Sequence, residues 1–558
     1  MNRRTSLFTA LLAIGILMLQ SCYYKPFIGY QLNKKGFKNF SKAERLAGAN
    51  SNPQRDYHVN RYDWEVEVFP EEKRISGKMD IAFTTQSAQS TFLFDLQRSM
   101  KIDSFESSVG SPTVERKGDL LYFNFTESVP ANTRIELSIV YAGKPVSVAD
   151  EGPIQWKEDE EGRVWISTQT EGIGPHFIMP CNALLRAEPD SVTIAVTVPN
   201  DLVTVANGKL IGVEENGDNQ TKTYTHEIVN RINTYNLSFN VGHFVELTKP
   251  YTDLNGIERQ LTFHVLDYHR ATADTFYDQT PIILKELEAL YGEFPFWEDG
   301  CKFIESTFSA MEHQSGIAMG SDYNYDWKKY NLTLIHELAH EWWGNSITGH
   351  DYCDMWIHEG MATYSEALVL ERIYDREDCD LRMRNAALYP INTIPILKEC
   401  DVLYNSWSND ADQDIYDKGA LMMHSLRKVV ADDKLFFNSL RAMQEELAHQ
   451  NISTAEIRAK FTELLGQDYS PLFDWYLTEV KPPVLEVYPD REAGLIYYKW
   501  SAEIPFYPKG EVYLKRGDEI LTLVPTTDYQ SLKAKEGAKI DFLVERSIYY
   551  ALEIKKKM

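Results

Sequence analysis

The sequence predicts a multidomain α+β protein. The chain has 558 residues, which is more than one ordinary hydrophobic core organises and suggests about three domains. Residues 56–247 alternate apolar and polar side chains with a period of two, which is typical of half-buried strands. Helical spacing of apolar residues dominates residues 248–480, and short strand-like runs return in residues 481–558. We therefore expect an all-β domain, a mixed domain rich in helices and a small β domain, in that order.

The first 22 residues have the pattern of a bacterial lipoprotein signal. Two arginines, at positions 3 and 4, precede an uncharged stretch over residues 7–19 that fits the apolar region of a secretory signal. The stretch ends in the run Leu19–Cys22, which resembles a lipobox, where the chain is cut before a cysteine that then carries a lipid. We expect lipid on Cys22 to anchor the exported protein in the bacterial cell envelope, on the periplasmic or outer-membrane face. The alternative is an ordinary cleaved signal with a chance cysteine.

The region after the signal divides into a tether and a β domain. Residues 23–55 are polar and lack a sustained period, so they predict a tether with little fixed structure that could include one short helix. The run Tyr62–Val68 then alternates apolar with acidic side chains. Similar strands are predicted at Val192–Val198 and Tyr235–Val241. These strands place the β domain in residues 56–247.

The helix-rich region begins with a short predicted strand, Gln260–Val265. Later in this region, Ser453–Glu456 forms a capping box that predicts the start of a helix. The run Lys481–Pro483 ends the helical pattern. Strand-like runs beyond it, such as Leu485–Tyr488 and Ile548–Ile554, predict a small β-sandwich about the size of an immunoglobulin-like domain.

Charge and cysteine content narrow the classes of function. The formal net charge is −25, so the surface repels phosphate backbones and nucleic-acid binding is not expected. Acidity is compatible with cationic partners, such as metal ions or peptide amino groups, and equally with a role in solubility alone. Five cysteines remain beyond Cys22, and they lack CxxC spacing. We therefore expect at least one unpaired thiol, mostly buried cysteines, and neither a disulfide scaffold nor a zinc ribbon.

The run His336-Glu337-Leu338-Ala339-His340 carries the strongest chemical signal. Positions i and i+4 share one face of a helix, so both imidazoles can reach one metal ion. Glu337 lies one step round the helix, where it can act on a water molecule instead of the metal. Glu359 follows His340 with eighteen residues between them and opens a second predicted helix, Glu359–Arg372. Two histidines and a glutamate with an open fourth position form the ligand set of a hydrolytic zinc site, so these three residues are predicted to bind one Zn²⁺ per chain. The alternative for Glu359 is a solvated acidic residue near a helix start.

The runs His336–Asn345 and Trp356–Tyr364 closely resemble the aminopeptidase N family of gluzincin metallopeptidases, which includes a leukotriene hydrolase. Three further segments agree. Ser309–His313 resembles the family's Gly-x-Met-Glu-Asn exopeptidase loop, Thr168–Glu171 its Thr-Gln-x-Glu segment, and Tyr416–Gly419 its Tyr-x-Lys-Gly segment. The resemblance extends over residues 56–480. It implies an N-terminal β-sandwich or saddle domain packed on a thermolysin-like catalytic domain, with the active site between the two.

The resemblance also implies a role for each site residue. Glu337 would be the general base that acts on a zinc-activated water, and Tyr416 would donate a hydrogen bond to the oxyanion. A peptide's free α-amino group has a pKa near ~8 and is mostly cationic at neutral pH, so carboxylates close to the zinc can bind it and set the cut after the first residue. The residues expected to bind substrate are Glu312, Gln169, Glu171, Ala310 and Met311.

Three residues depart from the family's pattern. Ser309 replaces the usual glycine, which makes a glycine-only backbone conformation less accessible. His313 and His358 each stand where the family has asparagine. These changes bear on the strength and specificity of activity, because every predicted zinc ligand and the general base are retained. Glu341 is expected either to orient a ligand histidine or to be exposed on its helix.

The leading hypothesis is an exported aminopeptidase that acts on peptides with a free amino terminus. One alternative is a zinc hydrolase of a non-peptide substrate, against which the retained Glu312 and Glu171 argue. The other is a non-catalytic, peptide-binding surface lipoprotein. Against this alternative, the zinc ligands, Glu337 and Tyr416 are all present. The sequence leaves open the preferred first residue of the substrate, the oligomeric state and the disulfide pairing.

Overall fold

A computed structural model describes most of the chain from residue 51 onward. The described residues are 48–49, 51–146, 152–217, 220–397, 400, 413–490, 492–505, 512–516, 519–533, 540–543 and 546–556. The predicted signal, Cys22 and most of the predicted tether lie outside these residues. In the part of the chain that is described, no helix has the length and apolarity needed to cross a membrane.

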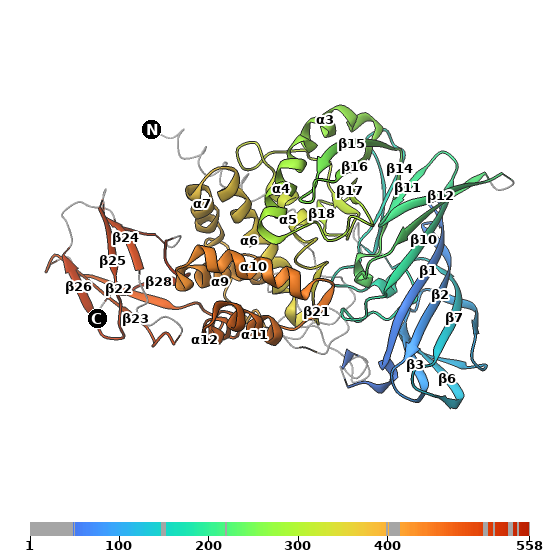
Figure 1. Cartoon of the computed structure of the whole chain (residues 1–558), viewed down its shortest axis with the longest axis horizontal. Helices are drawn as coiled ribbons and strands as arrows, with labels where there is room; N and C mark the ends of the chain where they lie inside the picture. Colours follow the sequence, from blue (N-terminus) through green and yellow to red (C-terminus); the bar gives the residue numbers. More distant parts are fainter. Residues whose placement is uncertain are drawn as a thin grey trace.

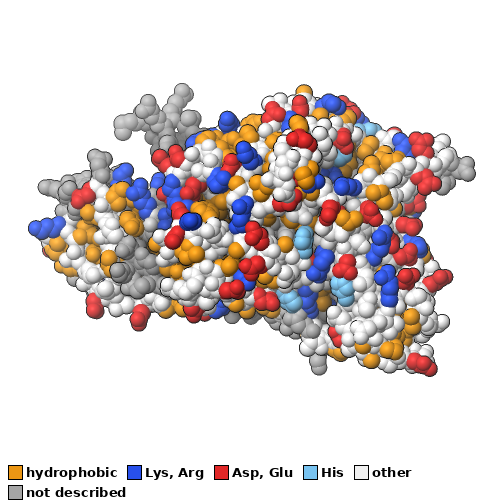
Figure 2. Space-filling model, viewed as in Figure 1, with side chains coloured by type: hydrophobic (Ala, Val, Ile, Leu, Met, Phe, Trp, Pro, Cys, Tyr) orange, Lys and Arg blue, Asp and Glu red, His pale blue; other side chains and the backbone are white. Residues whose placement is uncertain are grey.

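The predicted multidomain architecture is confirmed. Figure 1 shows a β-rich region at one end, a helix-rich region in the middle and a small β domain at the other end, in chain order. On the face drawn in Figure 2, the described acidic and basic side chains are intermixed over all three regions.

The N-terminal region is built on a seven-stranded sheet with the strand order β12-β13-β10-β1-β2-β7-β4. In β1, Tyr62, Trp64, Val66 and Val68 are buried while the residues between them are not, as the alternation predicts. Two smaller sheets, β3-β6-β5 and β11-β14-β9-β8, complete the region. Its strands are β1 (Tyr57–Phe69), β2 (Arg74–Thr85), β3 (Gln89–Asp95), β4 (Lys101–Ser107), β5 (Thr113–Lys117), β6 (Leu120–Val129), β7 (Arg134–Gly143), β8 (Ile154–Glu158), β9 (Val164–Thr168), β10 (Ser191–Pro199), β11 (Val203–Ala206), β12 (Lys209–Asn216), β13 (Thr221–Ile228) and β14 (Phe239–Gly242).

The predicted strand Tyr235–Val241 is wrong in its first half. A short 3₁₀ helix, η3 (Thr234–Asn236), comes first, and β14 begins only at Phe239. The Asn233 side chain accepts a hydrogen bond from the backbone N–H of Tyr235 at 3.1 Å. Such a local bond offers the backbone an alternative to a sheet ladder, so the chain turns before the strand starts.

A short helix lies at the end of the predicted tether. Another 3₁₀ helix, η1 (Pro53–Arg55), is capped by Asn52, and the Arg55 side chain is buried. The two terminal nitrogens of Arg55 lie 2.6 and 2.8 Å from the two carboxylate oxygens of Asp95. Because a buried carboxylate needs a paired charge, Arg55 fixes the start of the β region in place.

The middle region combines a five-stranded sheet with a set of helices. The sheet has the order β15-β16-β17-β19-β18, and a separate pair joins β20 to β21. Its strands are β15 (Phe244–Thr252), β16 (Glu258–Leu266), β17 (Cys301–Glu305), β18 (Ala310–Met311), β19 (Ile317–Met319), β20 (Ile347–Gly349) and β21 (Gln450–Ile452). Its helices are α3 (Arg270–Phe276), α4 (Thr280–Tyr291), α5 (Leu332–Ala339), α6 (Trp356–Ile373), α7 (Arg376–Ala386), α9 (Asp417–Val430), α10 (Asp433–Leu447), α11 (Thr454–Leu465) and α12 (Ser470–Thr478). The capping box predicted at the start of α11 is confirmed.

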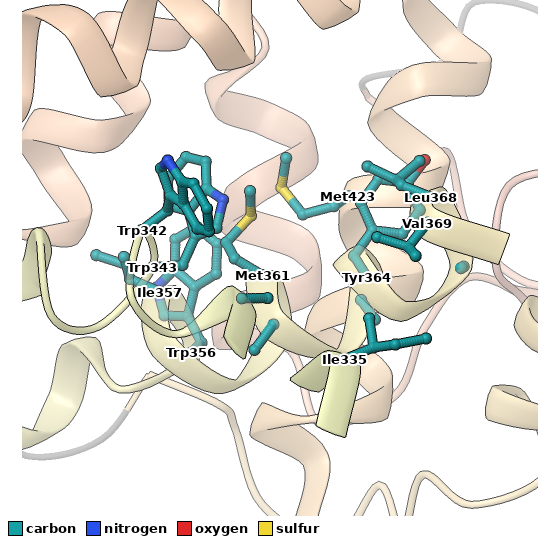
Figure 3. Close-up of a cluster of buried hydrophobic side chains, with 14 of the residues drawn as sticks. Ile335, Trp342, Trp343, Trp356, Ile357, Met361, Tyr364, Leu368, Val369 and Met423 are labelled. Atoms are coloured by element: carbon teal, nitrogen blue, oxygen red, sulfur yellow. The ribbon is translucent and has the colours of Figure 1, made fainter. Parts of the chain in front are cut away.

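Close packing of α5, α6 and α9 forms the core beneath the predicted metal site. Large side chains fill it, including Trp342, Trp356 and Met361 (Figure 3). Helices α6 and α9 approach each other at two glycines, since a Cβ on Gly360 would meet the Cα of Gly419 at 3.0 Å. The absence of side chains at this crossing brings the start of α9 beside α6.

The C-terminal domain has two small sheets, ordered β26-β23-β22-β28 and β25-β24-β27. Its strands are β22 (Val484–Asp490), β23 (Leu495–Trp500), β24 (Val512–Arg516), β25 (Glu519–Leu523), β26 (Gln530–Lys533), β27 (Ile540–Phe542) and β28 (Ala551–Ile554). The predicted strand Ile548–Ile554 is therefore too long at its start. The backbone of Tyr549 instead bonds to helices, accepting from the Tyr476 hydroxyl at 2.6 Å and donating to the Ser425 hydroxyl at 2.8 Å.

Replacement of Arg55 tests the role of its buried ion pair. Arg55→Ala leaves Asp95 buried without its counter-charge, and we expect the free energy of unfolding to fall by about 3–5 kcal/mol in urea titrations. The matched control is Arg61→Ala, whose partner Asp63 and own side chain are 41% and 37% exposed. That loss should stay below about 1 kcal/mol. Equal losses in the two variants would contradict this interpretation.

Candidate active site

Helices α5 and α6 bring the three predicted metal ligands together. Asn331 caps the start of α5 by accepting from the backbone N–H of Leu334 at 2.7 Å, and His340 ends the same helix. The Nε2 atoms of His336 and His340 lie 3.2 and 3.4 Å from Oε2 of Glu359. One ligand atom from each of the three residues lies within 4.8 Å of the others, and all three side chains are buried.

The donor chemistry at this point fits a zinc ion. The Nδ1 of His340 faces the carbonyl oxygen of Trp343 at 2.9 Å, and a carbonyl can only accept, so this nitrogen carries the proton. In a neutral ring, Nε2 then turns a lone pair toward the Glu359 carboxylate. Two imidazole nitrogens and one carboxylate oxygen that converge on one point are a protein ligand set that catalytic zinc prefers.

The charges of these groups call for a cation. Burial alone would lower the pKa of His336, but Glu359 and Glu366 outweigh burial and raise it well above its usual value. Burial would likewise raise the pKa of Glu359, yet the two histidines hold it below its usual value. The carboxylates therefore attract positive charge to the point where the ligand atoms meet.

Helix α6 begins at Trp356, three residues before the predicted start at Glu359. A short 3₁₀ helix, η6 (Tyr352–Asp354), is closed by a capping box from Asp351 and leads directly into α6. Glu359 is consequently in the first turn of α6, with its side chain turned toward α5.

A second carboxylate of α6, which the sequence analysis did not identify, orients His336. Oε1 of Glu366 lies 3.0 Å from Nδ1 of His336, and Oε2 of Glu366 accepts from Nε of Arg382 at 2.8 Å. Arg382 also lies 3.5 Å from the Asp417 carboxylate, next to Tyr416. Carboxylates that hold the far nitrogen of a ligand histidine fix its orientation and increase its basicity. The seven-residue spacing from Glu359 to Glu366, two helical turns, was the available sequence signal.

Glu337 is placed to act as a base. Its side chain is buried on α5, and its Oε2 atom has no hydrogen-bond partner among the described residues. Glu337 also offers an oxygen within 4.8 Å of ligand atoms of His340 and Glu312. Burial raises the pKa of Glu337 to about 8. Burial thus increases the affinity of this carboxylate for a proton, which favours a general base.

Tyr416 is the N-cap residue of α9 and lies against the predicted metal ligand His336. Its half-buried ring stacks on the imidazole of His336, with the ring centres 6.1 Å apart and the planes 21° from parallel. The Gly360–Gly419 crossing makes this approach possible, because Tyr416 stands three residues before Gly419.

The structure also brings together both of the predicted amine-binding carboxylates. Glu171, from the β region, and Glu312, from the middle region, offer oxygens within 4.8 Å of each other and of Glu359. Burial raises the pKa of Glu312. Strand β18 (Ala310–Met311) leads into Glu312, and both of its side chains are buried. Gln169 is half-buried just after β9.

The departures from the family's pattern have separate structural outcomes. Ser309 is absent from the described residues with positive φ, so its side chain imposes no backbone strain. His313 is fully buried, burial lowers its pKa to about 3, and neither ring nitrogen has a hydrogen-bond partner among the described residues. Both alternatives for Glu341 are wrong: it is buried, and its Oε1 accepts from the backbone N–H of Ser315 at 2.9 Å.

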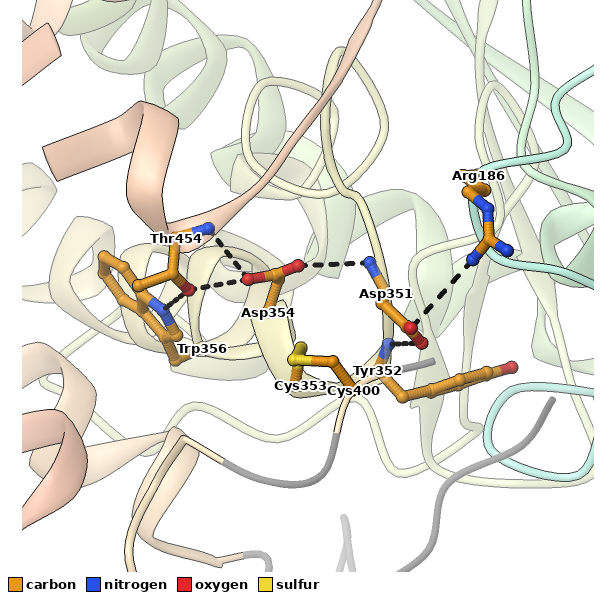
Figure 4. The surroundings of a disulfide bond; sticks show 8 residues. All are labelled: Arg186, Asp351, Tyr352, Cys353, Asp354, Trp356, Cys400 and Thr454. Atoms are coloured by element: carbon orange, nitrogen blue, oxygen red, sulfur yellow. Dashed lines mark hydrogen bonds and ion pairs between the residues drawn. A yellow bond between two sulfur atoms is a disulfide. The ribbon is translucent and has the colours of Figure 1, made fainter. Parts of the chain in front are cut away.

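A disulfide between Cys353 and Cys400 secures the start of α6 (Figure 4). The bond closes a 47-residue separation that includes Glu359 and Glu366. A loop of this length corresponds to about 4 kcal/mol of stabilisation in the chain-entropy model. Asp354 adds a second attachment by accepting from the backbone and hydroxyl of Thr454 at 2.8 and 2.6 Å. The expectation of unpaired, buried thiols is confirmed by three free cysteines, Cys181, Cys301 and Cys379.

Two histidines of one helix and a glutamate of the next, beside a free buried glutamate, define a gluzincin-type metal site. Two family models match the chain: the peptidase M1 N-terminal domain over residues 58–236 and the peptidase family M1 domain over residues 308–476. The chain therefore belongs to peptidase family M1, the family of the aminopeptidase N-like gluzincins.

Several relatives of this chain are aminopeptidases. Aminopeptidase M1-B of Oryza sativa is 25% identical over 362 residues, which are 58% of this chain and 38% of the relative. Probable aminopeptidase 1 of Sulfurisphaera tokodaii is 23% identical over 475 residues, 78% of this chain and 56% of the relative. The chain thus spans about two-fifths to just over half the length of these two relatives. Leukotriene A-4 hydrolase of Xenopus laevis is 21% identical over 75% of this chain and 73% of its own length.

Solved structures share the fold. The M1 zinc metallopeptidase of Deinococcus radiodurans matches with a TM-score of 0.67 and 21% identity, covering 77% of this chain and 96% of that one. A variant of that protein bound to a Tyr-Ser-Ala substrate gives the same TM-score and coverage, with 22% identity.

Replacement of Glu366 tests its control of the metal site. Glu366→Ala should lower zinc affinity about 10- to 100-fold, because His336 loses the partner that fixes its ring. Competition against a chromogenic chelator measures this affinity. Glu371→Ala is the matched control, since Glu371 lies on the same helix but pairs with Arg427. Unchanged zinc affinity in Glu366→Ala would show that the ring is fixed by other contacts.

Proposed function

We propose that this chain is a zinc-dependent aminopeptidase that hydrolyses the amino-terminal bond of peptides. One zinc ion would be held by His336, His340 and Glu359. The observation that carries the proposal is the pair Glu171 and Glu312, whose carboxylate oxygens lie within 4.8 Å of a metal ligand. Carboxylates at that distance, Glu312 buried and Glu171 half-buried, can bind an ammonium group and place the first peptide bond at the metal. The aminopeptidase names of the relatives support the same function.

Each catalytic group of the chain has a defined task in this proposal. Zinc, when bound, supplies a Lewis acid that polarises a carbonyl and lowers the pKa of water toward ~7. Glu337 accepts the proton of the attacking water through its unengaged Oε2 and returns it to the leaving amine. The hydroxyl of Tyr416, whose ring lies against His336, donates a hydrogen bond to the developing oxyanion. Glu171 and Glu312 hold the substrate ammonium.

The buried carboxylates of the site also distinguish between the candidate functions. A non-peptide hydrolase needs no cation-binding site beside the metal, whereas Glu312 is buried at this point at a cost in desolvation. A binding protein without catalysis needs no base, whereas Glu337 is buried without engaging its second oxygen. The arrangement as a whole therefore favours hydrolysis of a substrate with a free amine.

We further propose that the protein is exported and anchored by lipid on Cys22 in the bacterial cell envelope. The Cys353–Cys400 disulfide supports export, because disulfides persist mainly outside the reducing cytosol.

Hydrolysis of aminoacyl p-nitroanilides by zinc-loaded protein purified without its signal tests the enzymatic proposal. We expect turnover that a chelator abolishes, that zinc restores and that acetylation of the substrate amine prevents. Glu337→Gln should lower kcat about 10²- to 10⁴-fold with zinc content unchanged. Glu377→Gln, at an exposed site on α7, should retain full activity. Full activity of Glu337→Gln would contradict the assigned base.

Membrane fractionation tests the anchor. In a bacterial host that processes lipoproteins, the native sequence should partition into the membrane and detergent fractions, and Cys22→Ser should not. Cys301→Ala, which alters a buried free thiol, is the control and should remain in the membrane. Retention of Cys22→Ser in the membrane would point to an attachment other than the lipid.

A further inference from the structure

A line of hydrogen bonds connects His358, which departs from the family's pattern in α6, to the carboxylate of Glu312. The backbone N–H of Gly349 lies 2.7 Å from Nε2 of His358. Nδ1 of His358 lies 3.3 Å from the hydroxyl of Tyr235, and that hydroxyl lies 2.8 Å from Oε1 of Glu312. The side chains of all three linked residues are at most 2% exposed. Three separate elements, α6, η3 and the loop after β18, thus meet at Glu312.

The direction of each hydrogen bond follows from the available protons. Gly349 N–H can only donate, so Nε2 of His358 accepts and the ring proton is on Nδ1. Nδ1 then donates to the Tyr235 oxygen, and the tyrosine donates its single proton to the Glu312 carboxylate. No group in the line has a competing orientation, so the tyrosine hydroxyl is fixed toward Glu312.

The surrounding backbone leaves room for an imidazole at position 358. Gly344 has φ +125°, and a Cβ there would meet the His358 ring at 3.2 Å. A Cβ on Gly349 would meet Nε2 of His358 at the same distance. An asparagine, which the family's pattern has at this position, reaches as far as Nδ1 but has no atom at the place of Nε2. The bond to Gly349 is therefore available to histidine and not to asparagine.

The neighbouring residue of η3 holds the backbone of the same glutamate. Nδ2 of Asn236 donates to Oδ1 of Asn345 at 2.7 Å, and Nδ2 of Asn345 donates to the carbonyl oxygen of Glu312 at 3.0 Å. Consecutive residues Tyr235 and Asn236 therefore fix the side chain and the main chain of Glu312. Both belong to the short helix that replaces the first half of the predicted strand.

We propose that His358 and Tyr235 are positioning residues for amine recognition: they hold Oε1 of Glu312 in place and leave its other oxygen to bind the substrate ammonium. The proposal rests on the proposed aminopeptidase function and deepens it. Neither residue takes part in bond cleavage. Their loss should therefore weaken binding of free-amine ligands while zinc binding and turnover of bound substrate continue.

The test compares Tyr235→Phe, His358→Phe and the double variant with the native zinc-loaded protein. KM and kcat are measured on leucine p-nitroanilide, and zinc content by elemental analysis. The dissociation constant is measured by isothermal titration calorimetry for L-leucinol, which has the free amine but no amide bond to hydrolyse. We expect Tyr235→Phe to raise KM and the dissociation constant about 10-fold or more, since its lost bond is to a charged group. His358→Phe should raise both about 2- to 10-fold, since its lost bond is to the neutral tyrosine hydroxyl. Zinc content and kcat should change less than about threefold. His358→Asn should retain most of the affinity.

The double variant decides whether the two residues act as one unit. If His358 acts through Tyr235, adding His358→Phe to Tyr235→Phe produces no further loss. The matched control is Tyr291→Phe, which removes another buried hydroxyl that contacts α6, at Ser365, and should leave both constants unchanged. Multiplicative losses, loss of zinc in His358→Phe, or an unchanged dissociation constant in Tyr235→Phe would each overturn the proposal.

The calorimetric measurement separates this proposal from the proposed function. A native protein that binds zinc but hydrolyses no amide would contradict the aminopeptidase function. L-leucinol binding, and its dependence on Tyr235, would still show whether the line of hydrogen bonds fixes an amine site. Hydrolysis of amides by the native protein, with equal L-leucinol binding in all variants, would contradict the positioning role alone.

Discussion

A cluster of mostly buried carboxylates at the junction of the first two regions is the constraint on which this structure depends. Glu171, Glu312, Glu337, Glu359 and Glu366 all lie around the two ligand histidines. Arg382, which pairs with Glu366, offsets part of this negative charge. Since burying carboxylates is costly, cations that occupy the junction stabilise the native arrangement. A metal ion between the ligands and an ammonium group between Glu171 and Glu312 supply such charge in different places, so binding and stability share one electrostatic origin.

Such a cluster needs a rigid frame, because like charges would otherwise move apart. The frame is made of features with no charge at the metal. The Cys353–Cys400 disulfide fixes the chain just before α6, and the glycine crossing fixes α6 against α9. Lys418 adds a further restraint by donating to the carbonyl oxygens of Glu479 and Val480, where the C-terminal domain begins. Since Tyr416 stands two residues before Lys418, the linker to the C-terminal domain helps to hold the residue proposed to stabilise the oxyanion.

The sequence predicts the parts of the site that arise within one or two helices. The spacing of His336, Glu337 and His340 determines their relation on a helix, because that relation depends on 3.6 residues per turn and little else. Glu366 could have been found by the same reasoning from Glu359. Arg382 and Tyr235 could not, since each reaches the site through tertiary packing. The resemblance to a family supplied Tyr416, Glu312 and Glu171, which no local periodicity marks.

The error in the predicted secondary structure at Tyr235 has a related cause. The apolar run from Tyr235 to Val241 alternates like a strand, but the Asn233 side chain bonds to the backbone and turns the chain into η3. That irregular turn directs Tyr235 and Asn236 toward Glu312 instead of into a ladder. A regular strand would have pointed these two neighbours to opposite faces of a sheet, where they could not hold one residue together. The failure of the local pattern therefore coincides with the place where the β region contributes to the site, as expected where function competes with regular structure.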